Sequence, residues 1–425
     1  MIFFILLSKN FMEENITPVK PAERIALLDI LRGLAIFGIL MVNMQMFYQP
    51  ATSVIAGYAG SETIADKIST GVIKFLFEGK FYILFSLLFG YGFWMFINKK
   101  TDDGNSILPV FRRRVAILLL LGIMHVVLLW AGDILVWYAV FGFVLILFRK
   151  KSDRSLIKWA FWLAMVPVVM TALSVLMVRL GMADPQAAAG IEASMQEREA
   201  WMADFLARAS AVYSEGTLRE IVTIRLQEYM NLLPGVLFFY PVVLGVFLVG
   251  VWAARSGIIK NPAEHVSFFR KVLWRGLITG VIFSALYTWS FFRTGAMTVP
   301  GIWMFISMTS HIVAGFSLSV AYVSIIVLLY IKGRLGLPAR LLAPVGRMAL
   351  TNYLLQSIIC TTLFLSYGFG LFGKISAFQG LLLTIVIFGL QIPFSRIWLK
   401  HFHFGPFEWL WRSLTYMKVQ PFIRR

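Results

Sequence analysis

Long apolar stretches recur along the chain at the length that a membrane-spanning helix needs. A helix that crosses the hydrocarbon core of a bilayer takes roughly 20 predominantly apolar residues, and ten windows of this kind follow one another. They lie near residues 25–47, 72–97, 113–130, 134–149, 157–180, 233–254, 272–292, 301–331, 345–367 and 375–395. This pattern predicts an all-α protein, a polytopic transmembrane helix bundle of about ten spans.

A long polar stretch, residues 182–230, separates the first five windows from the last five. Its apolar positions recur with roughly helical spacing, which predicts a pair of short amphipathic helices on the outer membrane surface. The predicted parts of the chain are an N-terminal tail, a first half of five helices, this outer segment, a second half of five helices and an aromatic, basic C-terminal tail, at 1–24, 25–181, 182–230, 231–398 and 399–425.

Lys and Arg residues indicate which way the helices run through the membrane. Of the 39 such residues, most fall in every second loop and in the two tails. Positive residues gather on the cytoplasmic side of membrane proteins. We therefore expect both termini to be cytoplasmic and residues 182–230 to lie outside.

Composition agrees with a membrane protein and excludes several other classes. Apolar residues make up 59% of the chain and charged residues only 14%, whereas soluble domains are near half apolar and a quarter charged. The net charge of +18 would favour nucleic acid as a partner of a soluble protein. Cytoplasmic loops account for that charge here, so we expect no nucleic-acid partner. A single cysteine, Cys360, rules out a disulfide framework and a Cys-based metal site, and we expect no metal.

Five ionisable residues are predicted to lie near the cytoplasmic mouth of the bundle. Asp29 and Arg32 are three residues apart, on one face of the first helix, and Arg112, Arg113 and Arg114 precede the third window. A local salt bridge and ordinary anchoring of basic residues explain them without a ligand. The alternative is a site for the phosphates of a donor, since the arginine fork suits phosphate oxygens.

A second polar group is predicted in the outer half of the membrane. Asn43, Glu78, Lys80 and His125 fall at a similar depth when a rise of about 1.5 Å per residue is applied, and Asp133 follows in a tight turn. Ionisable residues inside a bilayer are costly, so each is a functional candidate. His125 is a candidate general base, and either Glu78 or Asp133 could orient it. A satisfied hydrogen-bonding role is the simpler explanation for a single histidine.

Polar residues are more scattered in the second half of the chain. His311, Asn352 and Gln356 lie within the later windows. Amides and hydroxyls commonly join transmembrane helices by hydrogen bonds, and that is the simpler explanation for these positions. Lining of a substrate site is the alternative.

Several motifs resemble those of the YeiB-like family of bacterial inner-membrane proteins of unassigned function. The similarity extends over nearly the whole chain and is carried by RIALLDILRGLAIFGILMVNM (24–44), EGKFYILFSLLFGYGF (78–93), FRRRVAILLLLGIMHVVLLWAGDILVWYA (111–139), PVGRMALTNYLLQS (344–357) and FGPFEWLWRSLTY (404–416). The resemblance implies a multi-pass protein of a bacterial inner (plasma) membrane.

The opening motif is also similar, more distantly, to that of two groups of membrane acyltransferases. These are acyltransferase family three and the heparan-alpha-glucosaminide N-acetyltransferase group, which move an acyl group from a cytoplasmic acyl-CoA-like donor to an acceptor at the other membrane face. The resemblance implies that Asp29, Arg32 and Arg112–Arg114 form the binding site of such a donor, with the arginines binding its phosphates.

The histidine of these acyltransferases has no counterpart here. The first group has a histidine at the position of Asn43, and the second takes one from the loop after the first helix, where residues 48–70 contain none. If this chain transfers acyl groups, its base must come from elsewhere, and His125 is the candidate.

These observations lead to the hypothesis of a membrane-embedded acyltransferase with acyl-CoA as donor substrate and a cell-envelope sugar or lipid as acceptor. His125 would act as base and Asn43 would donate a hydrogen bond to the developing oxyanion, with Glu78 and Asp133 as candidate orienters. The residues expected to line the substrate site are Lys80, His311, Asn352 and Gln356. The alternatives are a transporter or permease for a small solute that uses the same buried charges, and a non-catalytic membrane scaffold.

Overall fold

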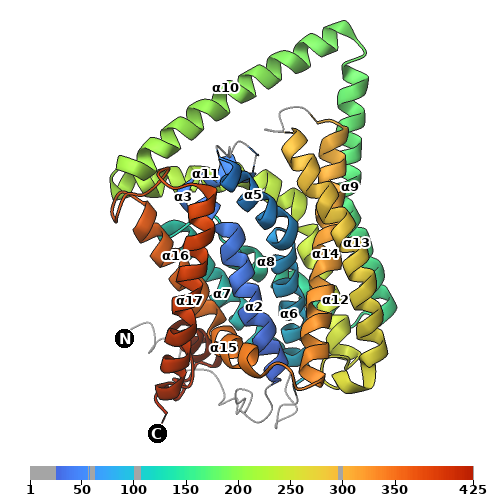
Figure 1. Cartoon of the computed structure of the whole chain (residues 1–425), viewed down its shortest axis with the longest axis vertical. Coiled ribbons are helices and arrows are strands. Elements are labelled where there is room, and N and C mark those ends of the chain that lie inside the picture. The colour runs from blue at the N-terminus through green and yellow to red at the C-terminus, as the bar shows by residue number, and fades with distance from the viewer. Residues whose placement is uncertain (1–24, 56, 58–62, 100–106, 295–299, 425) are drawn as a thin grey trace.

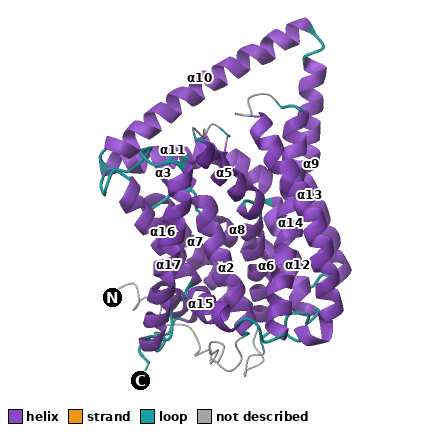
Figure 2. Ribbon diagram, viewed as in Figure 1, coloured by secondary structure: helices purple, strands orange, loops and turns teal. Residues whose placement is uncertain are grey.

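The protein is a bundle of helices. The computed structural model describes residues 25–55, 57, 63–99, 107–294 and 300–424, so the predicted tail 1–24 lies outside the described residues. Within those ranges the regular elements are helices, and the only β-pairing is an isolated bridge between Phe402 and Ile423. Figure 2 shows helices throughout, which confirms the predicted all-α class.

The first half of the chain builds the centre of the bundle, except for its last helix, which lies at one edge (Figure 1). Its elements are α2 (Ala26–Asn43), α3 (Gln45–Tyr48), α4 (Ala51–Ile55), α5 (Ile64–Val72), a π-helix (Ile73–Phe77), α6 (Lys80–Ile97), α7 (Leu108–Leu128), α8 (Leu135–Leu145) with a 3-10 turn (Ile146–Phe148), and α9 (Asp153–Gly181).

The second half adds further helices around this centre. They are α10 (Pro185–Glu215), α11 (Leu218–Phe239), α12 (Pro241–Arg255), a 3-10 turn (Pro262–His265), α13 (Val266–Thr294), α14 (Ile302–Ile331), α15 (Gly336–Arg347), α16 (Ala349–Phe364), α17 (Ala377–His401) and α18 (Pro406–Tyr416). Each of the ten predicted windows is occupied by helix.

Helices of membrane-spanning length lie in both halves. In the described ranges, five segments are long and apolar enough to cross a bilayer, namely α2, α9, residues 262–293 with α13, α14 and α17. A sixth follows if α11 and α12, which meet at a bend of 52°, form one span, while residues 135–148 and α16 are shorter apolar helices. The chain is therefore a polytopic membrane protein, and ten full crossings stay a prediction.

The outer helices turn apolar side chains away from the protein. On α9, Trp162 is 64% exposed and Met177 is 68% exposed. Similar apolar exposure occurs on α13 at Trp274 and on α17 at Leu390. Because such surfaces are unfavourable in water but suit lipid tails, these faces are the lipid-contacting surface of the bundle.

The predicted helix over residues 72–97 is broken rather than continuous. A π-helix ends at Phe77, Glu78 is extended, and Gly79 takes a left-handed φ of 85° before α6 begins. Glycine populates this region of φ at little cost. The apolar pattern misses the break because the residues on both sides of it are equally apolar.

The polar segment 182–230 contains two helices, α10 and the first part of α11, and both are longer than the expected short pair. Helix α10 continues for 31 residues before Gly216 ends it, and it crosses one end of the bundle obliquely, opposite to α15 (Figure 1). Its many Ala, Glu, Gln and Met residues favour a continuous helix. Near its end, the Tyr213 hydroxyl donates to the Glu228 carboxylate of α11 at 2.8 Å, and the Thr52 amide donates to the same carboxylate at 3.1 Å.

Glycines allow the central helices to touch backbone to backbone. A Cβ atom on Gly90 of α6 would overlap the carbonyl of Phe247 in α12, and one on Gly250 of α12 would overlap the carbonyl of Leu87. Helices α2 and α15 meet in the same way, where a Cβ on Gly346 would overlap the carbonyl of Asp29. Small residues at such crossings let transmembrane helices pack closely.

We expect Gly250→Ala to lower the free energy of unfolding by about 1–3 kcal/mol, because the added methyl overpacks a backbone contact that cannot yield. The control is Gly389→Ala in α17, where a Cβ meets no atom within 4 Å and alanine raises helix propensity. Thermal unfolding in detergent measures both changes. Equal midpoints for the two variants would contradict the close crossing of α6 and α12.

Candidate functional site

A histidine is held between a carboxylate and a hydroxyl inside the bundle. Nδ1 of His125 lies 2.8 Å from Oδ1 of Asp133, and Nε2 lies 2.8 Å from Oγ of Ser357. The side chains of His125 and Asp133 are fully buried, and Ser357 is 1% exposed. The candidate site is this triad of His125, Asp133 and Ser357.

The turn between α7 and α8 positions the first two members. Helix α7 ends one turn after His125, and the amides of Leu129 and Trp130 both donate to the His125 carbonyl at 2.9 Å. Asp133 then precedes α8, where its Oδ2 accepts the Val136 amide at 2.7 Å. An acceptor in this place satisfies one of the open amides of a helix start, whose dipole also favours negative charge.

The third member comes from a helix far away in the sequence. Ser357 lies in the middle of α16, which is fixed to α17 by amide side chains. Gln356 donates to Gln391 at 2.8 Å, and Asn352 donates to Ser395 at 3.0 Å. These hydrogen bonds fit the simpler explanation for Asn352 and Gln356, in which they join helices.

The two hydrogen bonds favour one tautomer of a neutral imidazole. An ionised carboxylate only accepts, so a neutral ring next to Asp133 carries its proton on Nδ1 and leaves Nε2 free to accept the Ser357 hydroxyl proton. A hydroxyl, an imidazole and a carboxylate in this order form the arrangement in which a histidine can act as general base. The structure thus pairs His125 with Asp133, one of the two carboxylates that the sequence left open.

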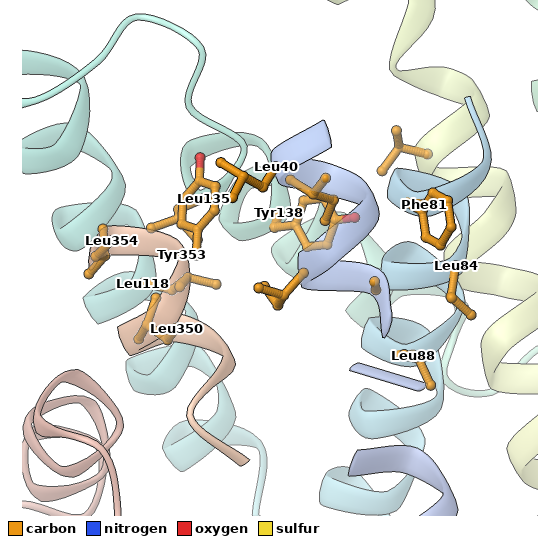
Figure 3. Close-up of a cluster of buried hydrophobic side chains, with 14 of the residues drawn as sticks. Leu40, Phe81, Leu84, Leu88, Leu118, Leu135, Tyr138, Leu350, Tyr353 and Leu354 are labelled. Atoms are coloured by element: carbon orange, nitrogen blue, oxygen red, sulfur yellow. The ribbon is translucent and has the colours of Figure 1, made fainter. Parts of the chain in front are cut away.

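A cavity of about 330 Å³ leads from one end of the bundle toward the triad. It runs between α2, α6, α7, α8, α15, α16 and α18. Its walls are mainly apolar. Figure 3 shows three of the lining side chains, Leu118, Leu135 and Tyr353, close to one another. The Tyr353 ring lies 5.2 Å from the His125 ring between centroids. Tyr353 therefore both lines the cavity and packs against the imidazole.

Basic residues surround the outer part of the cavity, which we call the basic mouth. They are Arg32, Lys99, Arg114, Arg347 and Arg412, and two acidic residues, Asp29 and Glu408, lie among them. Positive charges therefore outnumber negative ones here, which suits an anionic ligand.

Only some of the basic residues that the sequence analysis assigned to one site line the cavity in the structure. Arg32 lines the mouth and also forms the expected salt bridge with Asp29 at 2.9 Å. Of the three consecutive arginines only Arg114 lines the cavity, while Arg112 is exposed and Arg113 lies outside the lining. Consecutive helical residues point about 100° apart, so three in a row cannot share one face.

The C-terminal helix α18 covers the basic mouth. The guanidinium of Arg114 lies 3.7 Å from the centre of the Trp411 ring, and the Trp411 indole donates to the Arg114 carbonyl at 2.8 Å. Glu408 accepts the amide of Thr351 near the start of α16 at 3.0 Å. Lys99, Arg347 and Arg412 were missed in the sequence because they lie on separate elements that only the fold brings together.

Glu78 and Lys80 belong to a second cluster at the break before α6. The Lys74 ammonium lies 2.8 Å from Glu78, which also accepts the Tyr287 hydroxyl at 2.5 Å. Lys80 donates to the Lys74 carbonyl at 2.9 Å, and the ring of His311 lies 4.9 Å from that of Tyr287. Lys74 was missed, although a lysine four residues before Glu78 is a recognisable signal.

Asn43 ends α2 and is half-buried. Both ring nitrogens of His125 have other partners, so Asn43 is not hydrogen-bonded to the imidazole. It lies one turn before Phe47, whose ring stacks on Trp130 beside the triad at 4.2 Å. Its role as an oxyanion donor stays a prediction.

Comparison with known proteins gives relatives of nearly the same length. A family described as "Protein of unknown function (DUF418)" matches residues 253–418, a range that contains Ser357. The chain is 34% identical to "Uncharacterized protein YxaH" of Bacillus subtilis, over 97% of this chain and 99% of the relative. It is 31% identical to "Uncharacterized protein YeiB" of Escherichia coli, over 95% and 99%. No solved structure matches the chain significantly.

We expect Asp133→Ala to lower the free energy of unfolding by about 1–3 kcal/mol, because it leaves the Nδ1–H of His125 and the Val136 amide unpaired in a dry environment. The matched control is Asp204→Ala on α10, whose carboxylate is 64% exposed and should contribute less than about 0.5 kcal/mol. Thermal unfolding in detergent compares the two. A shift no larger for Asp133→Ala than for the control would contradict the described hydrogen bonds.

Proposed function

The chain belongs to the YeiB-like family of proteins of unknown function, and for this member we propose a membrane-embedded acyltransferase of the bacterial inner membrane. One observation carries the proposal. The same cavity is lined by the basic mouth and by Tyr353. Tyr353 in turn packs on His125, which the Asp133 carboxylate orients. Such a path suits a donor that is anionic at one end and reactive at the other.

The basic mouth suits the phosphates of an acyl-CoA-like donor. Arg32 and Arg114 offer guanidinium groups, which bind phosphate oxygens through two parallel hydrogen bonds. The mouth lies at the end of the bundle that the distribution of basic loops assigns to the cytoplasm, where acyl-CoA is made. The apolar walls beyond it suit the long arm and the acyl chain, which would place the thioester near Tyr353.

The triad supplies the base for acyl transfer. His125 can remove a proton from an attacking hydroxyl or amine, and Asp133 stabilises the imidazolium that forms. The acceptor in this proposal is a cell-envelope sugar or lipid headgroup that arrives from the outer side. Burial of the triad keeps out water, which would otherwise hydrolyse the donor.

A second candidate function is transport of a small solute. The cluster of Lys74, Glu78, Lys80 and His311 lies at a break between helices, and charged residues at broken helices commonly bind substrates and coupling ions in transporters. Accumulation of solute in proteoliposomes without consumption of any acyl donor would favour this function over acyl transfer.

We expect His125→Gln to lower the rate of acyl transfer by roughly 10²–10⁴-fold, which is the usual contribution of a general base, and to leave donor binding unchanged. The assay follows release of free CoA from an acyl-CoA by the detergent-purified protein. His311→Gln is the control and should lose much less, because His311 lies in the other cluster. Full activity of His125→Gln with loss of activity in His311→Gln would move the active site to that cluster.

We expect Arg114→Gln to weaken binding of CoA by about tenfold to a hundredfold, which corresponds to the loss of one charge-assisted hydrogen bond. Arg112→Gln is a matched control two residues away, since Arg112 is exposed and does not line the cavity. Calorimetric titration with CoA measures both affinities. Equal affinities for the two variants would show that these arginines act only as anchors at the membrane surface.

A further inference from the structure

We infer that Ser357 is the nucleophile of the site and carries the acyl group as an ester between donor and acceptor. This inference rests on the proposed acyl transfer and adds the order of its steps. It makes the reaction a two-step exchange through an acyl-enzyme rather than direct attack by the acceptor on the thioester.

The position of the Ser357 hydroxyl distinguishes it from the other hydroxyls of α16. Thr361 and Thr362 donate to the carbonyls four residues earlier, each at 2.8 Å, as hydroxyls inside a helix commonly do. Oγ of Ser357 is instead 3.5 Å from the equivalent carbonyl of Tyr353 and 2.8 Å from Nε2 of His125. The hydroxyl is therefore directed at the imidazole.

The partners of His125 determine which atom of this hydrogen bond is the donor and which is the acceptor. Asp133 accepts from Nδ1, so Nε2 is the basic nitrogen and faces the Ser357 hydroxyl. Asp133 is itself fixed by the Val136 amide, which keeps the carboxylate from rotating away. A base that is held by an orienting carboxylate next to a hydroxyl is the arrangement that activates a serine as a nucleophile.

The first step transfers the acyl group to the enzyme. Oγ of Ser357 attacks the thioester carbonyl carbon and passes its proton to Nε2 of His125. The carbon–sulfur bond then breaks, and the imidazolium returns that proton to the leaving sulfur. The products are an acyl ester on Ser357 and free CoA.

In the second step the acceptor is the nucleophile and Ser357 is the leaving group. A hydroxyl or amine of the acceptor attacks the ester carbonyl while His125 removes its proton. The bond to Oγ then breaks and Ser357 regains its hydrogen from the imidazolium, so the enzyme returns to its starting state. No oxidant or further reactant is needed.

A covalent intermediate also explains how one buried site serves two sides of a membrane. Tyr353 precedes Ser357 by one helical turn, lies on the same side of α16, lines the cavity and packs against the imidazole. The proposed first step requires the Tyr353 ring to turn aside so that the donor carbonyl can reach Oγ. CoA can then leave through the basic mouth before the acceptor arrives from the other side, and the two substrates need not occupy the bundle together.

Two probes test the inference on the full-length protein in detergent. Acetyl-CoA and palmitoyl-CoA, each supplied without acceptor, should add one acyl group to the peptide that contains Ser357, as detected by mass spectrometry. A fluorophosphonate, which reacts with activated serines independently of any acyl donor, should label the same residue. His125→Gln should slow both reactions by roughly 10²–10⁴-fold.

The controls separate chemistry from folding. Ser357→Ala should lose acylation and labelling, and Thr362→Val, which removes a neighbouring exposed hydroxyl of α16, should retain both. Size-exclusion profiles and circular dichroism check that each variant is folded. If Ser357→Ala does not fold, loss of labelling in the folded His125→Gln variant provides the same test.

The outcomes distinguish failure of this inference from failure of the proposed function. Transfer of acyl groups without an adduct on Ser357, and with near-normal activity in Ser357→Ala, overturns the acyl-enzyme and leaves the acyltransferase standing. Fluorophosphonate labelling of Ser357 without consumption of either acyl-CoA overturns the proposed donor and leaves Ser357 as an activated nucleophile. Absence of both fluorophosphonate labelling and an acyl adduct in the wild-type protein overturns the assignment of Ser357 as the nucleophile.

Discussion

A carboxylate inside an apolar bundle must find a partner for each of its oxygens, because an unpaired charge there costs several kcal/mol. Asp133 meets this requirement with His125 on one oxygen and the Val136 amide on the other. These two bonds fix the turn between α7 and α8 and leave the second ring nitrogen pointing at α16. The bond from that nitrogen to Ser357 then ties the first half of the chain to the second.

The sequence predicts the helices and two of the three members of the triad. The length of an apolar stretch is a strong local signal for a helix, and each of the ten windows contains helix in the structure. His125 and Asp133 are only eight residues apart, so their proximity follows from one tight turn. Ser357 is 232 residues from His125, and a serine in an apolar helix has the same pattern as one that merely bonds its own backbone. Only the hydrogen bond that the fold creates between His125 of α7 and Ser357 of α16 singles it out.

Other features depend on backbone dihedral angles and on the direction of side chains around a helix, which the amino-acid composition does not contain. The break at Glu78 and Gly79 lies between equally apolar flanks, and the basic mouth is assembled from elements that are distant in the sequence. The three arginines before the third window look equivalent in sequence, but helical rotation directs only Arg114 into the cavity. Which of these arginines lines the cavity is therefore determined by its direction around the helix, and a count of positive charges does not contain that information.

The place of α18 has a consequence for the order in which the protein is made. Glu408, Trp411, Arg412 and Tyr416 of this helix form part of the cavity wall, and they are synthesised after all the other residues that line it. Until they are synthesised, the cavity lacks part of its wall and the start of α16 lacks the Glu408 carboxylate that accepts the Thr351 amide. A nascent chain already inserted in the membrane thus contains His125 and Ser357 before its cavity is complete, and the cavity closes only after α18 has been synthesised.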